Sequence, residues 1–372
     1  MASKVKISNL EENNNTLKFS ISNINVSYVN ALRRVLLSEI PCIVIKTEPH
    51  EENNVNIISN KTRLNNELIK QRISSIPIHI DELESFPIDD YIVILNKKND
   101  TNNIIYATSE DFEIKNIKLD KKLSKAEVSK IFPPDPISGD YIDIVRLLPN
   151  FNVDVDLEEI NLESKLTISN AKDNNMFNVV STASYGNSLD LPRIKEEWET
   201  KEKSLKDSYS KEEIEFLKKD WMLLDAKRIF IKDSFDFIIE TIGIYSNYKL
   251  LELASNIIIK KLYIALDSFK ENSDLISQSN DTMENTYILT LENEDYTIGK
   301  IIEFYLYSVY FKEKKELNYV GFLKKHPHDK NSIIKISFKE IIQKDDIILL
   351  IEESVNASLT LLNEIRNFFK TD

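Results

Sequence analysis

Cysteine, glycine and histidine are scarce in this sequence. Its 372 residues include one cysteine, five glycines and four histidines. The single cysteine, Cys42, excludes an internal disulfide and a four-cysteine zinc site. With five glycines a glycine-rich phosphate-binding loop is hard to build. Neither the P-loop motif G-x-x-x-x-G-K-[ST] nor the dinucleotide-binding motif G-x-G-x-x-G occurs. These absences indicate a protein of a reducing compartment that holds no nucleotide through a glycine-rich loop.

Long apolar runs are also missing, so no segment is expected to span a membrane. The opening residues, MASKVKISNL, lack the apolar stretch of a secretory signal. Acidic residues outnumber basic ones, with 61 Asp and Glu against 48 Lys and Arg and a formal net charge of −13. An acidic chain is poorly suited to grip a phosphate backbone with its whole surface. We therefore expect a soluble intracellular protein with no membrane partner and no direct nucleic-acid partner.

The composition is that of a folded globular protein, with 42% hydrophobic and 29% charged residues. Near the N-terminus apolar residues alternate on either side of a polar turn, which predicts a β-hairpin over residues 5–21. A helix is expected over 25–37, because apolar residues then recur at helical spacing until Ile40-Pro41.

The middle of the chain, residues 49–224, has the pattern of a β-rich insert domain. It contains a short helix at 65–72 and, towards its end, a highly charged helix over 195–221 that we expect to be a solvated connector. The turn-rich pieces between apolar runs separate short strands. Those strands are expected at 91–95, 103–108, 112–117, 141–148, 165–170 and 178–184.

After the insert the opening scheme of strand and helix returns. A strand at 235–239 precedes a long amphipathic helix over 249–269, and the polar stretch 271–285 is the best linker candidate. A strand at 287–291, a helix with Thr297 as N-cap, a strand at 334–338 and a long helix from about residue 345 follow. The sequence thus predicts an α+β fold with two similar half-units, each of which needs a cover for one face of its sheet.

Four motifs resemble one family of proteins. Residues 25–41, NVSYVNALRRVLLSEIP, look like the signature helix of the alpha-type subunits of DNA-directed RNA polymerases, which include the third-largest subunit of the eukaryotic enzyme. Residues 65–77, NNELIKQRISSIP, are similar to a second motif of that subunit. Residues 294–300, EDYTIGK, and 321–327, GFLKKHP, resemble the eleventh subunit, with Tyr296 and Lys300 in place of the usual His and Asn.

The resemblance implies a fusion of two subunits that are usually separate chains, as in large nucleocytoplasmic DNA viruses. It predicts a third-subunit-like dimerisation domain over 1–48 and 225–270, an eleventh-subunit-like domain over 286–372, and pairing of the two within one chain. It also implies a non-catalytic assembly subunit with no cofactor and no metal, because the zinc-binding cysteines of the third subunit are absent. The expected location is the cytoplasm or virion of such a virus, or otherwise the nucleus.

The same resemblance assigns partners and site residues. The partners implied are the largest and second-largest polymerase subunits and the small subunits of the assembly platform. The residues expected to bind partners are Asn30, Arg33, Arg34 and Arg72. The residues expected at the internal dimer-like interface are Leu32, Leu36, Ile257, Ile258, Ile298, Ile301, Ile302, Val355, Leu359 and Leu362.

Two other classes of function stay open at this point: an enzyme with a site in the β-rich insert, and a scaffold module outside the polymerase. The carboxylates between residues 154 and 159 alternate with apolar residues, which favours the solvated face of a strand over a catalytic or magnesium site. His326, His328 and Asp329 are too sparse for a metal site and favour a surface loop.

Replacing Arg34 by alanine (Arg34→Ala) is expected to weaken capture of the second-largest subunit and to leave the fold intact. The planar guanidinium makes bidentate contacts with carboxylates, and alanine cannot make them. Co-purification with tagged chains measures the capture, and thermal unfolding measures the fold. Normal co-purification together with native-like unfolding would count against the assignment.

Overall fold

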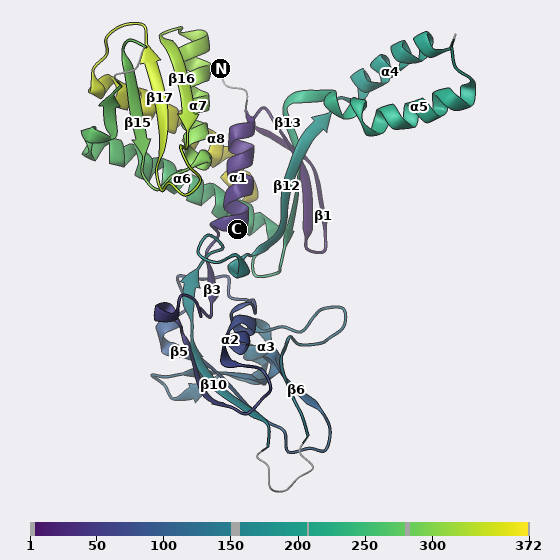
Figure 1. Ribbon diagram of the computed structural model, residues 1–372, viewed down its shortest axis with the longest axis vertical. Helices are drawn as coiled ribbons and strands as arrows, with labels where there is room; N and C mark the ends of the chain where they lie inside the picture. Colours follow the sequence, from purple (N-terminus) through teal and green to yellow (C-terminus); the bar gives the residue numbers. More distant parts are fainter. Residues whose placement is uncertain (1–3, 150–156, 207, 280–282, 371–372) are drawn as a thin grey trace. The chain divides into compact units, whose positions relative to one another are not determined.

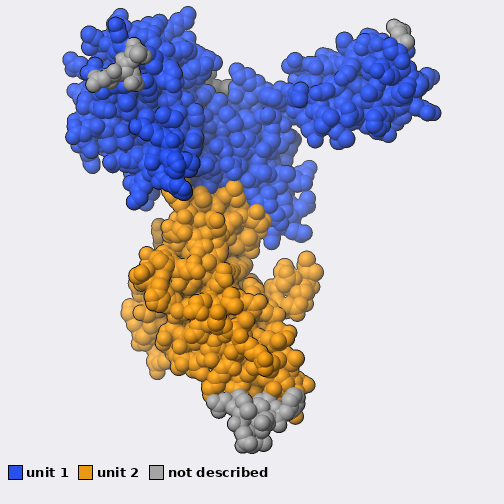
Figure 2. Space-filling model, viewed as in Figure 1, with its two compact units in different colours: residues 1–36, 182–240, 247–372 blue, residues 37–181, 241–246 orange. Residues whose placement is uncertain are grey.

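The computed structural model describes residues 4–149, 157–206, 208–279 and 283–370. The chain divides into two compact units (Figure 2): unit 1 comprises residues 1–36, 182–240 and 247–372, and unit 2 comprises residues 37–181 and 241–246. Unit 1 is therefore assembled from segments that flank unit 2 in the sequence. Both units combine helices with sheets. No helix in the described ranges is long and apolar enough to cross a bilayer.

The first sheet of unit 1 has four strands in the order β1-β2-β13-β12. The central strand β2 pairs antiparallel with β1 and with β13, and the second pairing sets Phe19 opposite Phe237. Alternate residues of β2 and β13 are buried, as the period-two pattern predicts. The four strands are β1 (Lys6–Asn13), β2 (Thr16–Ser22), β12 (Val180–Leu189) and β13 (Phe230–Thr241).

Two helices of unit 1 follow strands of this sheet in the chain, α1 (Val26–Ser38) and α6 (Asn247–Glu271). They correspond to the helices predicted over 25–37 and 249–269. Most apolar residues at helical spacing in both are buried, including Val29 and Leu32 of α1 and Leu250 and Ile258 of α6. Val26 in the first turn of α1 is an exception, with 45% of its surface exposed.

The second sheet of unit 1 also has four strands, in the order β14-β15-β17-β16, with antiparallel pairing throughout. A long helix, α8, follows the sheet and carries an apolar stripe along its length. A π-helical segment, Leu306–Glu313, continues α7. The elements are β14 (Ile276–Gln278), β15 (Thr286–Leu291), α7 (Tyr296–Tyr305), β16 (Leu317–Leu323), β17 (Ser332–Phe338) and α8 (Lys344–Phe369).

The charged region between β12 and β13 is a helical hairpin and not the single helix predicted over 195–221. It consists of α4 (Leu191–Leu205) and α5 (Lys211–Leu223), which lie side by side in Figure 1. The break has a local cause, because the Ser210 hydroxyl and the Glu213 carboxylate form a capping box that starts a new helix. Trp198 packs against Trp221 with ring centroids 5.5 Å apart. The hairpin therefore has a small core of its own.

Unit 2 is built around a five-stranded sheet in the order β4-β10-β5-β7-β8. Two further strand pairs, β3 with β11 and β6 with β9, and two short helices complete it. Its elements are β3 (Cys42–Val44), β4 (Val55–Asn60), α2 (Asn66–Ser74), β5 (Tyr91–Lys98), β6 (Ile105–Thr108), β7 (Phe112–Asn116), β8 (Lys121–Lys122), α3 (Lys125–Ile131), β9 (Asp143–Leu147), β10 (Glu159–Lys165) and β11 (Thr167–Ser169).

Several local predictions differ from the structure. The expected linker 271–285 contains β14, which is tied to β15 by three paired residues. Helix α7 begins two residues earlier than expected, because Asp295 and not Thr297 is its N-cap. The strand predicted at 165–170 is split between β10 and β11. Residues Asp154 and Asp156 of the carboxylate cluster lie outside the described residues, while Glu159 begins β10.

The predicted domain boundaries at 48/49 and 224/225 stay predictions. The compact units divide the chain at 36/37 and 181/182, and they place the α4–α5 hairpin with unit 1. The hairpin is thus grouped with the sheet whose strands flank it in the sequence.

Truncation of Leu362 (Leu362→Ala) is expected to destabilise unit 1. Leu362 of α8 is fully buried, and removal of a buried leucine side chain costs about 2–5 kcal/mol. Leu349 lies on the same helix with 57% of its surface exposed, so Leu349→Ala is expected to change stability by less than about 0.5 kcal/mol. Urea unfolding of both variants measures the difference, and equal losses would show that the burial of α8 is not what stabilises unit 1.

Candidate assembly interface

Helix α1 carries three of the four residues expected to bind partners. Its buried face includes Leu32 and Leu36, and the partly exposed face carries Asn30, Arg33 and Arg34. The Nε and Nη2 atoms of Arg33 donate to Oδ1 of Asn30 at 3.1 and 3.0 Å. Residues three apart meet on one side of a helix, so Asn30 holds the guanidinium of Arg33 in one orientation. The pair presents a positioned cationic group at the surface of α1.

The side chain of Arg34 is engaged by the chain itself. Its Nε donates to Oγ1 of Thr297 at 3.0 Å, and its Nη2 forms a hydrogen-bonded ion pair with Oδ2 of Asp295. Asp295 is also the N-cap of α7, since its Oδ1 accepts from the Thr297 amide at 2.9 Å. Arg34 therefore fastens α1 to the start of α7. Because Arg34→Ala removes these internal bonds, some loss of stability is now expected in addition to any effect on a partner.

The carboxyl group of Asp295 is stabilised in its charged form. Burial by itself would raise its pKa, but the amide of Thr297 and the guanidinium of Arg34 together hold the pKa of Asp295 below its usual value. About a third of each side chain of the pair is exposed, so solvent screens the attraction. The contact is a partly buried charge pair whose strength depends on pH.

A buried hydrogen bond joins α1 to α8. The hydroxyl groups of Tyr28 and Ser358 are 2.9 Å apart. Ser358 donates its own proton to the carbonyl of Ser354, so its oxygen accepts from Tyr28. Burial raises the pKa of Tyr28 to about 12, which keeps the phenol protonated as the donor at physiological pH. The ring of Tyr28 also meets Phe304 edge to face, with centroids 6.3 Å apart.

Helices α6 and α8 pack against each other along their apolar stripes. Of the ten residues expected at an internal interface, nine are buried and Ile257 of α6 is partly exposed. They lie on α1, α6, α7 and α8, and all four helices belong to unit 1 except for the last two residues of α1. Around the stripe, Lys270 pairs with Glu352 at 2.9 Å and Lys261 pairs with Glu294 at 3.1 Å.

The C-terminal end of α8 is anchored on the first sheet by aromatic rings. Phe369 is fully buried and its ring centroid lies 5.2 Å from that of Phe19 and 5.8 Å from that of Tyr248. Phe19 in turn stacks on Phe237 of the neighbouring strand at 5.2 Å. The contacts of α8 thus extend beyond α6 to strand β2, which is more than three hundred residues earlier in the chain.

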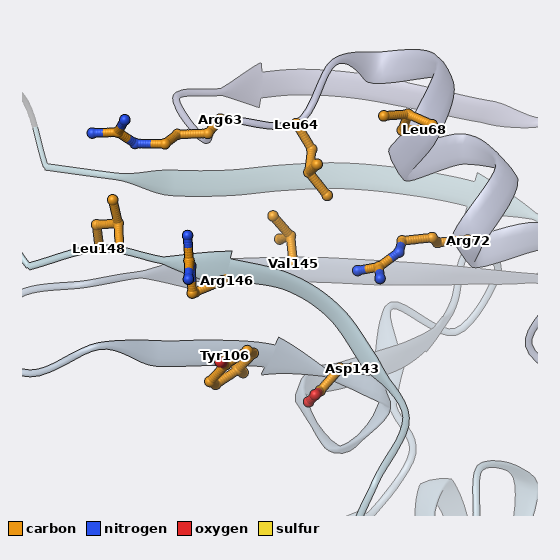
Figure 3. Close-up of a pocket in the computed structure, with 9 residues that line it drawn as sticks. All are labelled: Arg63, Leu64, Leu68, Arg72, Tyr106, Asp143, Val145, Arg146 and Leu148. Atoms are coloured by element: carbon orange, nitrogen blue, oxygen red, sulfur yellow. The ribbon is translucent and has the colours of Figure 1, made fainter.

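Arg72 belongs to unit 2, whereas Asn30, Arg33 and Arg34 belong to unit 1. Its side chain is exposed at the C-terminal end of α2, and its Nη1 donates to the carbonyl of Ile144 at 2.6 Å. It lines a groove with two other arginines, as Figure 3 shows.

Two charge pairs line the polar hollow of unit 2. A hollow beside α3 is lined by charged residues, among which Lys97 bonds Asp111 at 2.6 Å and Lys122 bonds Glu113 at 2.5 Å. Burial raises the pKa of Cys42 to about 12, so its thiol is protonated and a poor nucleophile. In the described ranges no three His, Cys, Asp or Glu side chains gather as metal ligands do.

The contacts of Arg34 with Asp295 and of Tyr28 with Ser358 were not anticipated. The partners are 261 and 330 residues apart in the chain. The motif residues Asp295 and Thr297 were visible, but a single sequence carries no signal that pairs them with α1.

Asp295→Asn is expected to lower stability by roughly 1 kcal/mol or less near neutral pH, given the exposure of the ion pair. The amide keeps the capping oxygen and removes the charge that Arg34 meets. Because the pKa of the native carboxyl is lowered, its stabilisation is present above the unfolded value of about 3.9 and is lost as the pH falls through the lower native value. The deficit of the variant should therefore shrink below about pH 4.

Urea unfolding over this pH range measures the effect, with Asp274→Asn at an exposed position as the control. A deficit that stays constant down to the lowest pH would show that the charge of Asp295 contributes nothing.

Comparison with known proteins gives consistent matches to subunits of RNA polymerases. The family described as the RNA polymerase Rpb3/Rpb11 dimerisation domain matches residues 18–262. The DNA-directed RNA polymerase subunit Rpo3 of Pyrococcus horikoshii is 23% identical over 270 residues, which are 69% of this chain and 95% of that protein.

Shorter matches have higher identity. The subunit Rpo3 of Pyrococcus furiosus is 30% identical over 118 residues, 30% of this chain and 42% of that protein. The DNA-directed RNA polymerase II subunit rpb3 of Dictyostelium discoideum is 35% identical over 77 residues, 21% of this chain and 23% of that protein. In these two alignments the chain spans less than half of its relative. The family match covers α1, unit 2 and most of α6, and on this ground the chain belongs to the RNA polymerase Rpb3/Rpb11 dimerisation domain family.

Proposed function

We propose that this chain is a non-catalytic assembly subunit of a multisubunit DNA-directed RNA polymerase, in which a third-subunit-like part and an eleventh-subunit-like part are joined covalently. The observation that carries the proposal is the apolar contact between α6 and α8. The family match at 18–262 includes most of helix α6 and ends before α8 begins. The contact has the character of a subunit interface, with an apolar centre and charge pairs at its margin.

The repetition of one layout supports the two-part proposal. The first part offers the sheet β1-β2-β13-β12 with α1 and α6, and the second offers the sheet β14-β15-β17-β16 with α7 and α8. In each part a short helix and a long helix accompany four strands. A sheet with one uncovered face needs a second layer, and pairing of the long helices gives both parts that layer.

The proposed partners are the largest and second-largest polymerase subunits and the small subunits of the platform. The Asn30–Arg33 pair on α1 and Arg72 on α2 are the proposed contact residues. Each presents a guanidinium that is held by internal hydrogen bonding to one residue and is at least partly exposed to a carboxylate of a partner. The net charge of −13 agrees with a platform that leaves the nucleic acid to the large subunits.

Covalent joining is proposed to speed assembly. A short tether raises the effective concentration of one part around the other to the order of millimolar, so pairing does not wait for a diffusional encounter. By its resemblance to fused viral subunits, the chain is proposed to act in a virus-encoded polymerase in the cytoplasm or virion, with the nucleus as the alternative site.

Co-expression tests the platform. A tagged full chain is expected to co-purify with the largest and second-largest subunits encoded in the same genome, and Leu362→Asp is expected to reduce their recovery about tenfold or more, because a buried charge opens the α6–α8 contact. Leu349→Asp on the exposed face of α8 is the matched control.

Recovery of neither large subunit with the wild-type chain would contradict the proposal and favour a scaffold outside the polymerase. The two-part organisation is tested separately, by expressing residues 1–271 and 272–372 as two chains. We expect them to co-purify as a one-to-one complex, and independent soluble monomers would contradict the pairing.

A further inference from the structure

A groove on the surface of unit 2 combines arginines with apolar side chains. It has a volume of about 540 Å³ and lies beside α2 and the two-stranded sheet of β6 and β9 (Figure 3). Its lining residues are Arg63, Leu64, Leu68, Arg72, Tyr106, Asp143, Val145, Arg146 and Leu148. Every one of them belongs to unit 2, so the groove is complete within that unit.

Three arginines supply the charge of the groove. Arg72 and Arg146 are exposed, and neither forms an ion pair with any residue that the structure describes. Arg63 lies 3.6 Å from Glu158, with 77% of its own side chain exposed. Asp143 is the one carboxylate among the nine lining residues. On a chain with a net charge of −13, this concentration of exposed guanidinium groups favours a negatively charged ligand.

Apolar side chains lie between the arginines. Leu68 and Tyr106 have 46% and 47% of their surface exposed. Leu64 and Leu148 are partly exposed at the same groove. A ligand that covered these side chains would gain from their burial in addition to any charge contact. The groove is therefore suited to a ligand that is both anionic and apolar.

The backbone of the groove and the side chain of Arg72 are held in place before any ligand binds. Arg72 is fixed by its hydrogen bond to the Ile144 carbonyl of β9. Tyr106 of β6 and Arg146 of β9 are directly opposite each other in the strand pairing. The loop before α2 is tied by the amide of Asn60, which donates to the Leu64 carbonyl at 2.9 Å. Such preorganisation lowers the entropic cost of binding.

We propose that this groove binds an acidic segment of another protein in which Glu or Asp residues alternate with at least one large apolar residue. Arginine forks match carboxylates in a bidentate manner, and the leucines and Tyr106 receive the apolar side chain. A nucleic acid fits less well, since its phosphates gain nothing from the leucines that line the groove. The inference deepens the proposed function, because a neighbouring polymerase subunit would supply the segment.

The test is a fluorescence-anisotropy titration of the full chain at physiological salt. The probe is a labelled peptide of repeating Glu-Glu-Leu, compared with a peptide of repeating Glu-Glu-Ser and with oligothymidylate of equal charge. We expect Arg63→Glu/Arg72→Glu/Arg146→Glu to weaken binding of the Glu-Glu-Leu peptide about tenfold or more, and the Glu-Glu-Ser peptide to bind several-fold more weakly to the wild-type chain.

The matched control carries the same change in charge at exposed lysines of unit 2 outside the groove, Lys98→Glu/Lys121→Glu/Lys172→Glu, and should bind the peptide within about twofold of wild type. Arg63→Glu/Arg146→Glu keeps Arg72 and its structural hydrogen bond, so it tests the groove even where loss of Arg72 impairs folding. Weak binding by the triple variant and normal binding by the control support the proposal.

Three results would overturn it: no binding of the Glu-Glu-Leu peptide to the wild-type chain, an equal loss in the lysine control, or tighter binding of the oligothymidylate, which would make the groove a nucleic-acid site. If the peptide titration fails but the wild-type chain still co-purifies with the large subunits, only the groove proposal is wrong. If the wild-type chain recovers neither large subunit, the proposed function itself is wrong.

Discussion

The burial of α6 against α8 is the contact on which the rest of unit 1 depends. Each helix carries an apolar stripe whose exposure to water would be unfavourable, and the two stripes cover each other. Non-directional burial of this kind supplies free energy but does not fix one orientation. The directional contacts do that: Arg34 fastens α1 to the cap of α7, and the Tyr28 hydroxyl meets Ser358 in the interior. Phe369 then fixes the far end of α8 on the first sheet.

The long amphipathic helices were predictable from the sequence, because a stripe with a period of 3.6 residues persists over many turns in α6 and α8. Short elements were not. Strand β14 has three residues, too few for any alternation, and it exists because β15 provides a partner. The helical hairpin was missed for another reason, since charged residues at helical spacing continue across the break. The Ser210–Glu213 capping signal was present in the sequence, but the contact of Trp198 with Trp221 that makes a hairpin favourable was not visible.

The candidate sites show the same limit more strongly. Motif resemblance identified Arg34 and Arg72, yet their surroundings depend on the tertiary structure. The carboxylate that meets Arg34 comes from 261 residues away. The groove around Arg72 forms only because β6 pairs with β9 and α2 lies beside them, which brings Arg63 and Arg146 to one place. Residue types are readable from one sequence, but the distances between them come from packing.

The short connection from α6 to the second sheet fixes the relative amounts in which the two sheets of unit 1 are made. Helix α6 ends at Glu271, and after a single turn at Ser273–Leu275 the chain enters β14, an edge strand of that sheet. Both sheets of unit 1 are therefore made from one message and in equal number. Neither can accumulate without the other, because both are translated as parts of one polypeptide.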